Sequence, residues 1–228
     1  MKIPLLRAPG HSLSGKIMRI IKSTLPICAA LVVNLLISHA VLAAQTDAGE
    51  FVKKLGNHAI RVLTVKDLTE VEREKRFRTL LRRGFDVKRI GRFVLGRYAR
   101  GVKQVEIDEY NGLFEDLIVA TYAARFAEYT GQEFVIKRVA KPKNRGDSIV
   151  MSEISPSNGG PSIRIDWQVH GKIDDYKIVD VRVEGVSMSV TQREEFTAVI
   201  RRNGGKVDAL LGVLRKKTEG LKSKQSSN

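Results

Sequence analysis

The apolar positions in the first half of the chain recur every three or four residues, which is the spacing of amphipathic helices. The stripes consist of Phe51, Leu55, Ala59 and Val62; of Phe77, Leu80 and Leu81; of Ile90, Phe93, Val94 and Tyr98; and of Phe114, Leu117, Ile118, Tyr122, Phe126 and Tyr129. The pattern predicts four successive helices, the last of them over about residues 106–129.

Capping residues mark the ends of two of these helices. Thr69 and Glu72 have the spacing of a capping box, with Thr69 as the N-cap. Gly84 follows the same stripe and is expected to be the C-cap. Asp86 is then placed to cap the next helix.

The period changes from about 3.6 to 2 in the second half, which is typical of strands. The predicted strands are residues 133–140, 148–155, 162–170 and 176–185. Their connections are too short for crossover helices, so neighbouring strands must run antiparallel. The prediction is an α+β fold, with helices packed on one face of a four-stranded antiparallel sheet.

Helical spacing returns after the sheet. Thr191 and Glu194 form a second possible capping box, and residues 203–205, Asn-Gly-Gly, are expected to end that helix. A last apolar stripe lies within residues 207–214. The polar residues 219–228 are predicted to be a disordered tail.

The first 44 residues carry five basic side chains and no acidic one, and they contain an apolar run over residues 25–42. Ala43 and Ala44 then supply the small residues of a cleavage site, so residues 1–44 are predicted to be a secretory signal that is removed. The alternative is an uncleaved membrane anchor, but polar residues inside the run favour removal. The single cysteine, Cys28, would leave with the signal, and residues 45–218 are expected to form one domain without disulfides.

Removal of the signal leaves 35 basic against 25 acidic residues, a net charge of +10. Such a charge favours anionic partners. The stretch 77–100 combines arginines with aromatic residues, as RNA-binding surfaces do, but an exported protein meets anionic lipid headgroups far more often than nucleic acid. We therefore expect no nucleic-acid partner. The arginines of this stretch are expected to be mostly a solvated face; they include Arg78, Arg82, Arg83, Arg89, Arg92 and Arg100.

The residues outside the signal offer little for catalysis. They include no cysteine and two histidines, His58 and His170. His170 and Asp166 share a strand face but would lie about 13 Å apart, too far for a catalytic dyad. No metal-binding motif is present, so the sequence indicates no enzyme, no metal and no cofactor.

Several motifs resemble one family of proteins. They are the stretch FDVKRIGRFVLGRY (85–98), the pair Asp166-Trp167, the stretch YKIVDVRVEGVSM (176–188) and the stretch REEF (193–196). In this order they resemble the MlaC family of periplasmic phospholipid-binding proteins, also called toluene-tolerance proteins. A hopanoid-associated branch of the family is similar too.

The resemblance implies a periplasmic carrier that moves phospholipid between the outer and inner membranes. Its implied partners are an inner-membrane Mla-type ABC transporter and an outer-membrane lipoprotein complex. It also implies that acyl chains lie in an apolar cavity between helices and sheet, with the headgroup near the opening.

The candidate lining residues are Ile90, Phe93, Val94, Tyr98, Tyr122, Phe126, Trp167, Val181 and Val183. Arg92 and Arg97 are the candidates for contact with the headgroup or a docking partner. The same apolar residues also have the spacing of an ordinary hydrophobic core. Two other functions stay open at this point, a basic module that binds an anionic polymer and a structural envelope protein without a small ligand.

Overall fold

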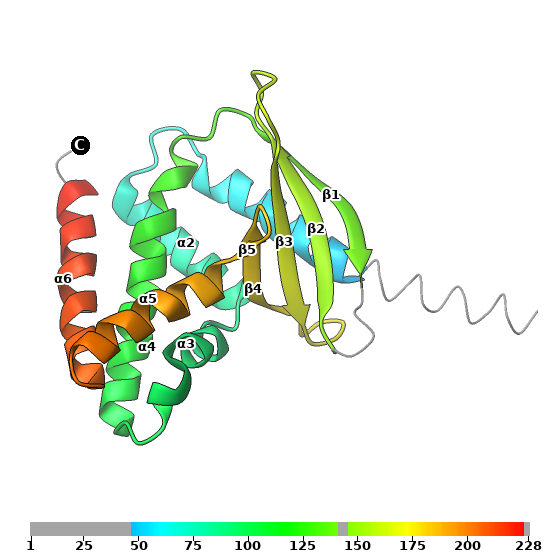
Figure 1. Ribbon diagram of the computed structural model, residues 1–228. Coiled ribbons are helices and arrows are strands. Elements are labelled where there is room, and N and C mark those ends of the chain that lie inside the picture. Colours follow the sequence, from blue (N-terminus) through cyan, green and yellow to red (C-terminus); the bar gives the residue numbers. More distant parts are fainter. Residues whose placement is uncertain (1–46, 141–145, 226–228) are drawn as a thin grey trace, which may run out of the picture. The chain divides into compact units, whose positions relative to one another are not determined.

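A computed structural model describes residues 47–140 and 146–225 (Figure 1). The predicted signal, residues 1–44, lies outside the described residues. The chain is α+β, as predicted, and its strands form one antiparallel meander in the order β1-β2-β3-β4-β5. The described elements belong to one compact unit, residues 44–228.

The helices and strands have the following bounds. The first helix covers residues 47–63, and it is followed by α2 (Glu70–Gly84), α3 (Val87–Leu95), the 3-10 turn η1 (Gly96–Ala99), α4 (Gln104–Tyr122) and the 3-10 turn η2 (Ala124–Phe126). The sheet comprises β1 (Glu133–Ala140), β2 (Ser148–Ser155), β3 (Ile163–His170), β4 (Lys177–Val183) and the short β5 (Val186–Ser187). Helices α5 (Met188–Arg202) and α6 (Val207–Gln225) close the chain. None of the helices within 47–140 and 146–225 is long and apolar enough to cross a membrane.

Four predicted boundaries are wrong. The sheet has a fifth strand, because residues 183–186 make a tight turn and β5 pairs back on β4. Helix α4 ends at Tyr122 rather than at residue 129, because the chain tightens into η2. Helix α5 starts at Met188 instead of near residue 191, since the Ser187 hydroxyl accepts a hydrogen bond from the Val190 amide at 3.1 Å.

The fourth error is the tail, because α6 continues through residue 219 to Gln225. Thr218 is buried in this helix, and its hydroxyl donates to the carbonyl of Leu214 at 2.9 Å. Leu221 packs against the helical core. These contacts stabilise a segment whose composition alone favours disorder.

The predicted start of α2 and the cap of α3 are confirmed. Thr69 accepts the amide of Glu72, and Asp86 accepts the amide of Arg89. Gly84 is instead the last helical residue of α2, and the lack of a side chain there lets the first helix come close. A Cβ there would lie 2.5 Å from Leu55 Cδ2 of the first helix.

The side chains form two main cores. The helical core joins α3, α4, α5 and α6, and its members are Val94, Leu95, Tyr110, Phe114, Leu117, Phe196, Ile200, Val207, Leu210, Leu211 and Leu214. The sheet core joins the first helix to the sheet, and its members are Ala48, Val52, Val150, Val169 and Ile178. A smaller cluster of Leu81, Val119 and Ala123 lies between α2 and α4, and Phe85 packs against both this cluster and the sheet core.

Basic side chains bind the C-terminal ends of two helices, where carbonyl groups lack partners within the helix. Arg73 is buried and donates to the carbonyl of Leu63 at 3.2 Å, and Arg76 donates to the carbonyl of Val62 at 3.0 Å. Both bonds join α2 to the end of the first helix. Lys177 of β4 likewise donates to the carbonyl of Arg83, at the end of α2, at 2.6 Å.

Glycine allows the first helix to approach the sheet closely. A Cβ on Gly56 would lie 2.6 Å from Cε1 of Phe134 in β1, and that ring is packed edge-on against Trp167. A Cβ on Gly112, within α4, would meet nothing within 4 Å. The two helical glycines therefore differ in packing alone.

We expect the Gly56→Ala substitution to lower the free energy of unfolding by roughly 1–3 kcal/mol, because the methyl group overlaps a fixed ring. The control substitution Gly112→Ala should raise it by about 0.5–1 kcal/mol, because alanine loses less backbone entropy in a helix. Urea unfolding followed by circular dichroism measures both. Equal stability of the two variants would contradict the close approach.

Candidate functional site

The predicted lining residues on α3 and η1 divide between the core and the surface. Val94 is fully buried in the helical core, and Ile90 and Tyr98 pack against that core. Phe93 is 43% exposed, and the guanidinium of Arg193 lies 5.0 Å from the centre of its ring. These four residues therefore do not form one continuous apolar surface.

Two of the predicted lining residues on the sheet belong to a different core from those on the helices. Trp167 and Val181 pack against the sheet core, opposite each other on β3 and β4. The Trp167 indole donates to the Ser152 hydroxyl at 2.8 Å, which satisfies its polar atom. Val183 is half-buried at the end of β4.

The two candidates at the end of α4 contact other elements. Tyr122 is 38% exposed, and its hydroxyl lies 4.0 Å from the Met188 sulfur at the start of α5. Phe126 in η2 packs its ring 5.9 Å from that of Phe77 on α2. We define Phe77, Tyr122, Phe126, Val183 and Met188 as the seam.

The seam residues come from α2, the end of α4, η2, the end of β4 and the start of α5. Val183 pairs with Val186, which stands two residues before Met188, and Met188 reaches Tyr122. Helix α2, which carries Phe77, lies against both β4 and η2. All five seam residues are partly exposed, unlike the members of the two cores.

The sequence did not single out Phe77 and Met188 as site residues. Phe77 has the spacing of an ordinary stripe, and Met188 follows directly after a strand. Only the contacts with η2 and with Tyr122 bring them together.

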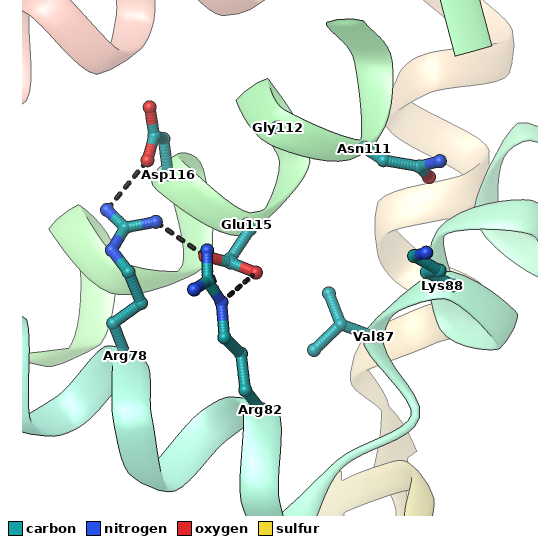
Figure 2. A pocket seen from close by; sticks show the side chains of 8 residues that line it. All are labelled: Arg78, Arg82, Val87, Lys88, Asn111, Gly112, Glu115 and Asp116. Atoms are coloured by element: carbon teal, nitrogen blue, oxygen red, sulfur yellow. Dashed lines mark hydrogen bonds and ion pairs between the residues drawn. The ribbon is translucent and has the colours of Figure 1, made fainter. Parts of the chain in front are cut away.

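The described residues do form a pocket, and most of the residues that line it are charged or polar (Figure 2). It has a volume of about 330 Å³ and lies between α2, α3 and α4. It is lined by Arg78, Arg82, Val87, Lys88, Asn111, Gly112, Glu115 and Asp116. The predicted apolar chamber between helices and sheet therefore stays a prediction.

The arginines of this pocket bind carboxylates and are not free for an anionic ligand. Arg78 Nη1 lies 2.7 Å from Glu115 Oε1, and its Nη2 lies 2.7 Å from Asp116 Oδ1. Arg82 Nη2 lies 2.8 Å from the same Glu115 oxygen. Arg78 and Arg82 thus join α2 to α4. Arg78 is partly buried there, which corrects the prediction of a solvated face for this one residue, whereas the other arginines of that prediction are exposed: Arg82, Arg83, Arg89, Arg92 and Arg100.

These ion pairs determine the charge state of the pocket. Burial raises the pKa of the Glu115 carboxyl, but the hydrogen bonds from Arg82 and Arg78 outweigh it and hold that pKa below its usual value. Burial lowers the pKa of Arg78, and the carboxylates of Glu115 and Asp116 more than compensate. Both partners are therefore charged at neutral pH.

The motif at residues 176–188 fixes the start of α5 to the sheet. Buried Asp180 accepts the hydroxyls of Ser187 and Ser189 at 2.8 Å each, and also the amide of Ser189 at 3.2 Å. Glu184 and Gly185 both have positive φ, 49° and 83°, as a two-residue hairpin turn requires. These residues of the motif therefore have a structural role, which is to form the β4–β5 turn and to hold the start of α5.

The histidines have local partners. His170 Nδ1 lies 2.6 Å from Asp147 Oδ1 instead of near Asp166, and His58 lies 2.7 Å from Arg61. Burial raises the pKa of Asp147, but hydrogen bonds from Gln168 and His170 outweigh it and lower that pKa. Within 47–140 and 146–225, no group of acidic, histidine or cysteine side chains could hold a metal ion.

The arrangement is that of a small α+β protein with two main cores and a set of partly exposed apolar residues, the seam. A model of the MlaC protein family matches residues 53–216. The chain belongs to the MlaC family, as its motifs predicted.

A solved structure has the same fold. It is the phospholipid-binding protein from Ralstonia solanacearum, in complex with a phospholipid. The TM-score is 0.68 at 22% sequence identity, and the match covers 77% of this chain and 98% of that one.

We expect the substitution Glu115→Gln to lower the free energy of unfolding by roughly 1–3 kcal/mol at neutral pH, because two arginines lose a charged acceptor. The lowered pKa means that the stabilising effect of Glu115 is present above its usual value of 4.5 and is lost as the pH falls through the lower folded pKa. Urea unfolding between pH 7 and pH 3 should show that the free energy of unfolding falls less with pH in the variant than in the wild-type protein. The exposed Glu194→Gln variant is the control, and the idea fails if its profile matches that of Glu115→Gln.

Proposed function

We propose that the protein binds a phospholipid and carries it between the outer and inner membranes. Membership of the MlaC family is the observation that carries this proposal. The shared fold with a protein solved in complex with a phospholipid supports it.

We propose that the acyl chains enter at the seam. Its five residues are apolar or aromatic and partly exposed, so they can contact a chain without the loss of a complete core. The helical core and the sheet core each have their own set of buried side chains, and no seam residue belongs to either set. A change in the contacts of Phe77, Tyr122 and Phe126 would therefore open a space while both cores keep their own packing and Asp180 holds the start of α5 to the sheet.

The energetics are consistent with a carrier that needs no energy source of its own. A chain of about fifteen methylenes gains on the order of 12 kcal/mol when it leaves water for an apolar site. The membrane interior offers nearly the same gain, so transfer between bilayer and protein is close to balanced. Trp167, Val181 and the helix residues Ile90, Val94 and Tyr98 would then support the seam residues from behind.

The proposed setting is the periplasm, with the segment 1–44 as the export signal. The proposed partners are an inner-membrane ABC transporter and an outer-membrane lipoprotein complex. Arg92 and Arg97 are both exposed, on α3 and η1. They are the proposed contacts for the headgroup or an acidic docking surface.

Organic extraction of the purified protein, followed by mass spectrometry, tests the proposal. Phospholipid in a constant ratio to protein supports it. Repeated absence of any lipid would overturn it and favour a structural role in the envelope, and a bound anionic polymer would favour the basic module.

We expect the Phe126→Asp substitution to remove most of the co-purifying lipid, because a charge at the seam is costly to bury beside an acyl chain. Val213→Asp is the control, since Val213 is an apolar residue with 45% of its surface exposed and lies on α6, which carries no seam residue. Circular dichroism checks that both variants are folded. Equal lipid content in the two variants would mean that the lipid does not bind at the seam.

We also expect the double reversal Arg92→Glu/Arg97→Glu to slow lipid transfer into inner-membrane vesicles that contain the transporter, because opposite charges on the two proteins would then repel. Lipid content at purification should stay unchanged if the arginines serve docking and fall if they hold the headgroup. The control is Lys66→Glu/Lys172→Glu, which changes the net charge equally at other exposed positions. Unchanged transfer and content in the Arg92/Arg97 variant would rule out both roles.

A further inference from the structure

Two loops come together at one end of the helical part. Helices α4 and α6 lie side by side, and both begin at the lower end in Figure 1. The ion pair between Glu109 and Arg215, at 2.6 Å, fixes their register. Glu109 is five residues into α4 and Arg215 eight residues into α6, so the two helices start at nearly the same level. The loop before α4 and the loop between α5 and α6 therefore share this end.

These two loops and the last turn of α5 carry exposed cations without an ion pair among the described residues, and we name this set the basic end. Its members are Arg100, Lys103, Arg201, Arg202 and Lys206, and all five are exposed. No ion pair holds any of them within the part of the chain that the structure describes. Arg78, Arg82 and Arg215, by contrast, are bound to carboxylates.

The acidic residues near the basic end are few and partly engaged. Glu106 accepts the backbone amide of Lys103 at 3.1 Å, and Asp108 accepts the side chain of Gln104 at 2.9 Å. Asp208 lies in the first turn of α6. The five cations thus exceed the three acids, and the basic end keeps a positive charge.

The shape of the basic end favours an extended partner. The loops contain three glycines with positive φ: Gly101, Gly204 and Gly205. Nothing lies within 4 Å of where their Cβ atoms would be, so no side chain covers the loops at these positions. Val105 projects from the start of α4 with 70% of its surface exposed. A surface of cations around one exposed apolar residue matches the boundary of a bilayer.

We infer that the basic end docks on an anionic membrane surface. Each Lys or Arg near such a surface adds to the attraction, which falls off with distance over about a Debye length. The seam lies at the opposite end of α4, some 27 Å away by the rise of the helix. Given the proposed function, this contact would hold the carrier near a membrane and would not itself be the place of lipid exchange.

Co-sedimentation with vesicles tests the inference. The probes are vesicles of phosphatidylcholine with added phosphatidylglycerol, and vesicles of phosphatidylcholine alone. The purified protein should bind the first kind and not the second, and binding should weaken as salt is raised. The variant Arg201→Gln/Arg202→Gln/Lys206→Gln should bind the anionic vesicles roughly a hundredfold more weakly, and the addition of Arg100→Gln/Lys103→Gln should weaken binding further.

The control is Lys53→Gln/Lys66→Gln/Lys172→Gln, which removes the same charge from exposed positions on other elements. It should keep most of the binding. Equal losses in the two triple variants would mean that net charge alone acts, and this would overturn the inference. Wild-type protein that ignores anionic vesicles would overturn it too and would leave an acidic protein as the partner of this end. Lipid extraction from the same preparation reports separately on the proposed cargo.

Discussion

The structure depends on the hydrogen bonds and ion pairs that arginine and lysine side chains make around α2. Arg73 and Arg76 bind the last carbonyls of the first helix, Arg78 and Arg82 bind carboxylates of α4, and Lys177 binds the last carbonyls of α2 itself. These contacts join the elements of the sheet core to those of the helical core, and apolar side chains such as Phe85, Val87 and Ile118 connect the same elements through the small cluster between α2 and α4. The high basic content thus has a structural role in addition to its effect on partners.

This arrangement leaves the partly exposed apolar seam as the part that can change. Each core is closed by fully buried side chains such as Ile178 and Leu210, and a change there would cost several kcal/mol. The seam residues Phe77, Phe126 and Met188 are already partly exposed, so they can exchange contacts at a lower cost. A carrier that admits a large apolar ligand needs this division between fixed cores and an adaptable boundary.

The sequence predicted the features that depend on local chemistry. Thr69 and Asp86 were recognised as caps because an N-cap side chain bonds an amide only two or three residues away. Strands β1 and β2 were placed correctly because alternation and short turns are local patterns. The start of α5 was missed because Ser187 is also held by Asp180, seven residues earlier, and that contact exists only after the β4–β5 turn has formed.

The candidate site shows the same division. The sequence by itself determined the fold class, the family and the list of apolar residues, because periodicity and motif order are properties of the chain. It could not tell Val94, which is fully buried, from Phe93, which lies under Arg193, although the two are neighbours in one stripe. Only the tertiary structure decided which arginines are bound and which are free, and which apolar residues meet across elements. Burial and charge pairing depend on groups that are distant in the chain, and no local pattern records which of them come into contact.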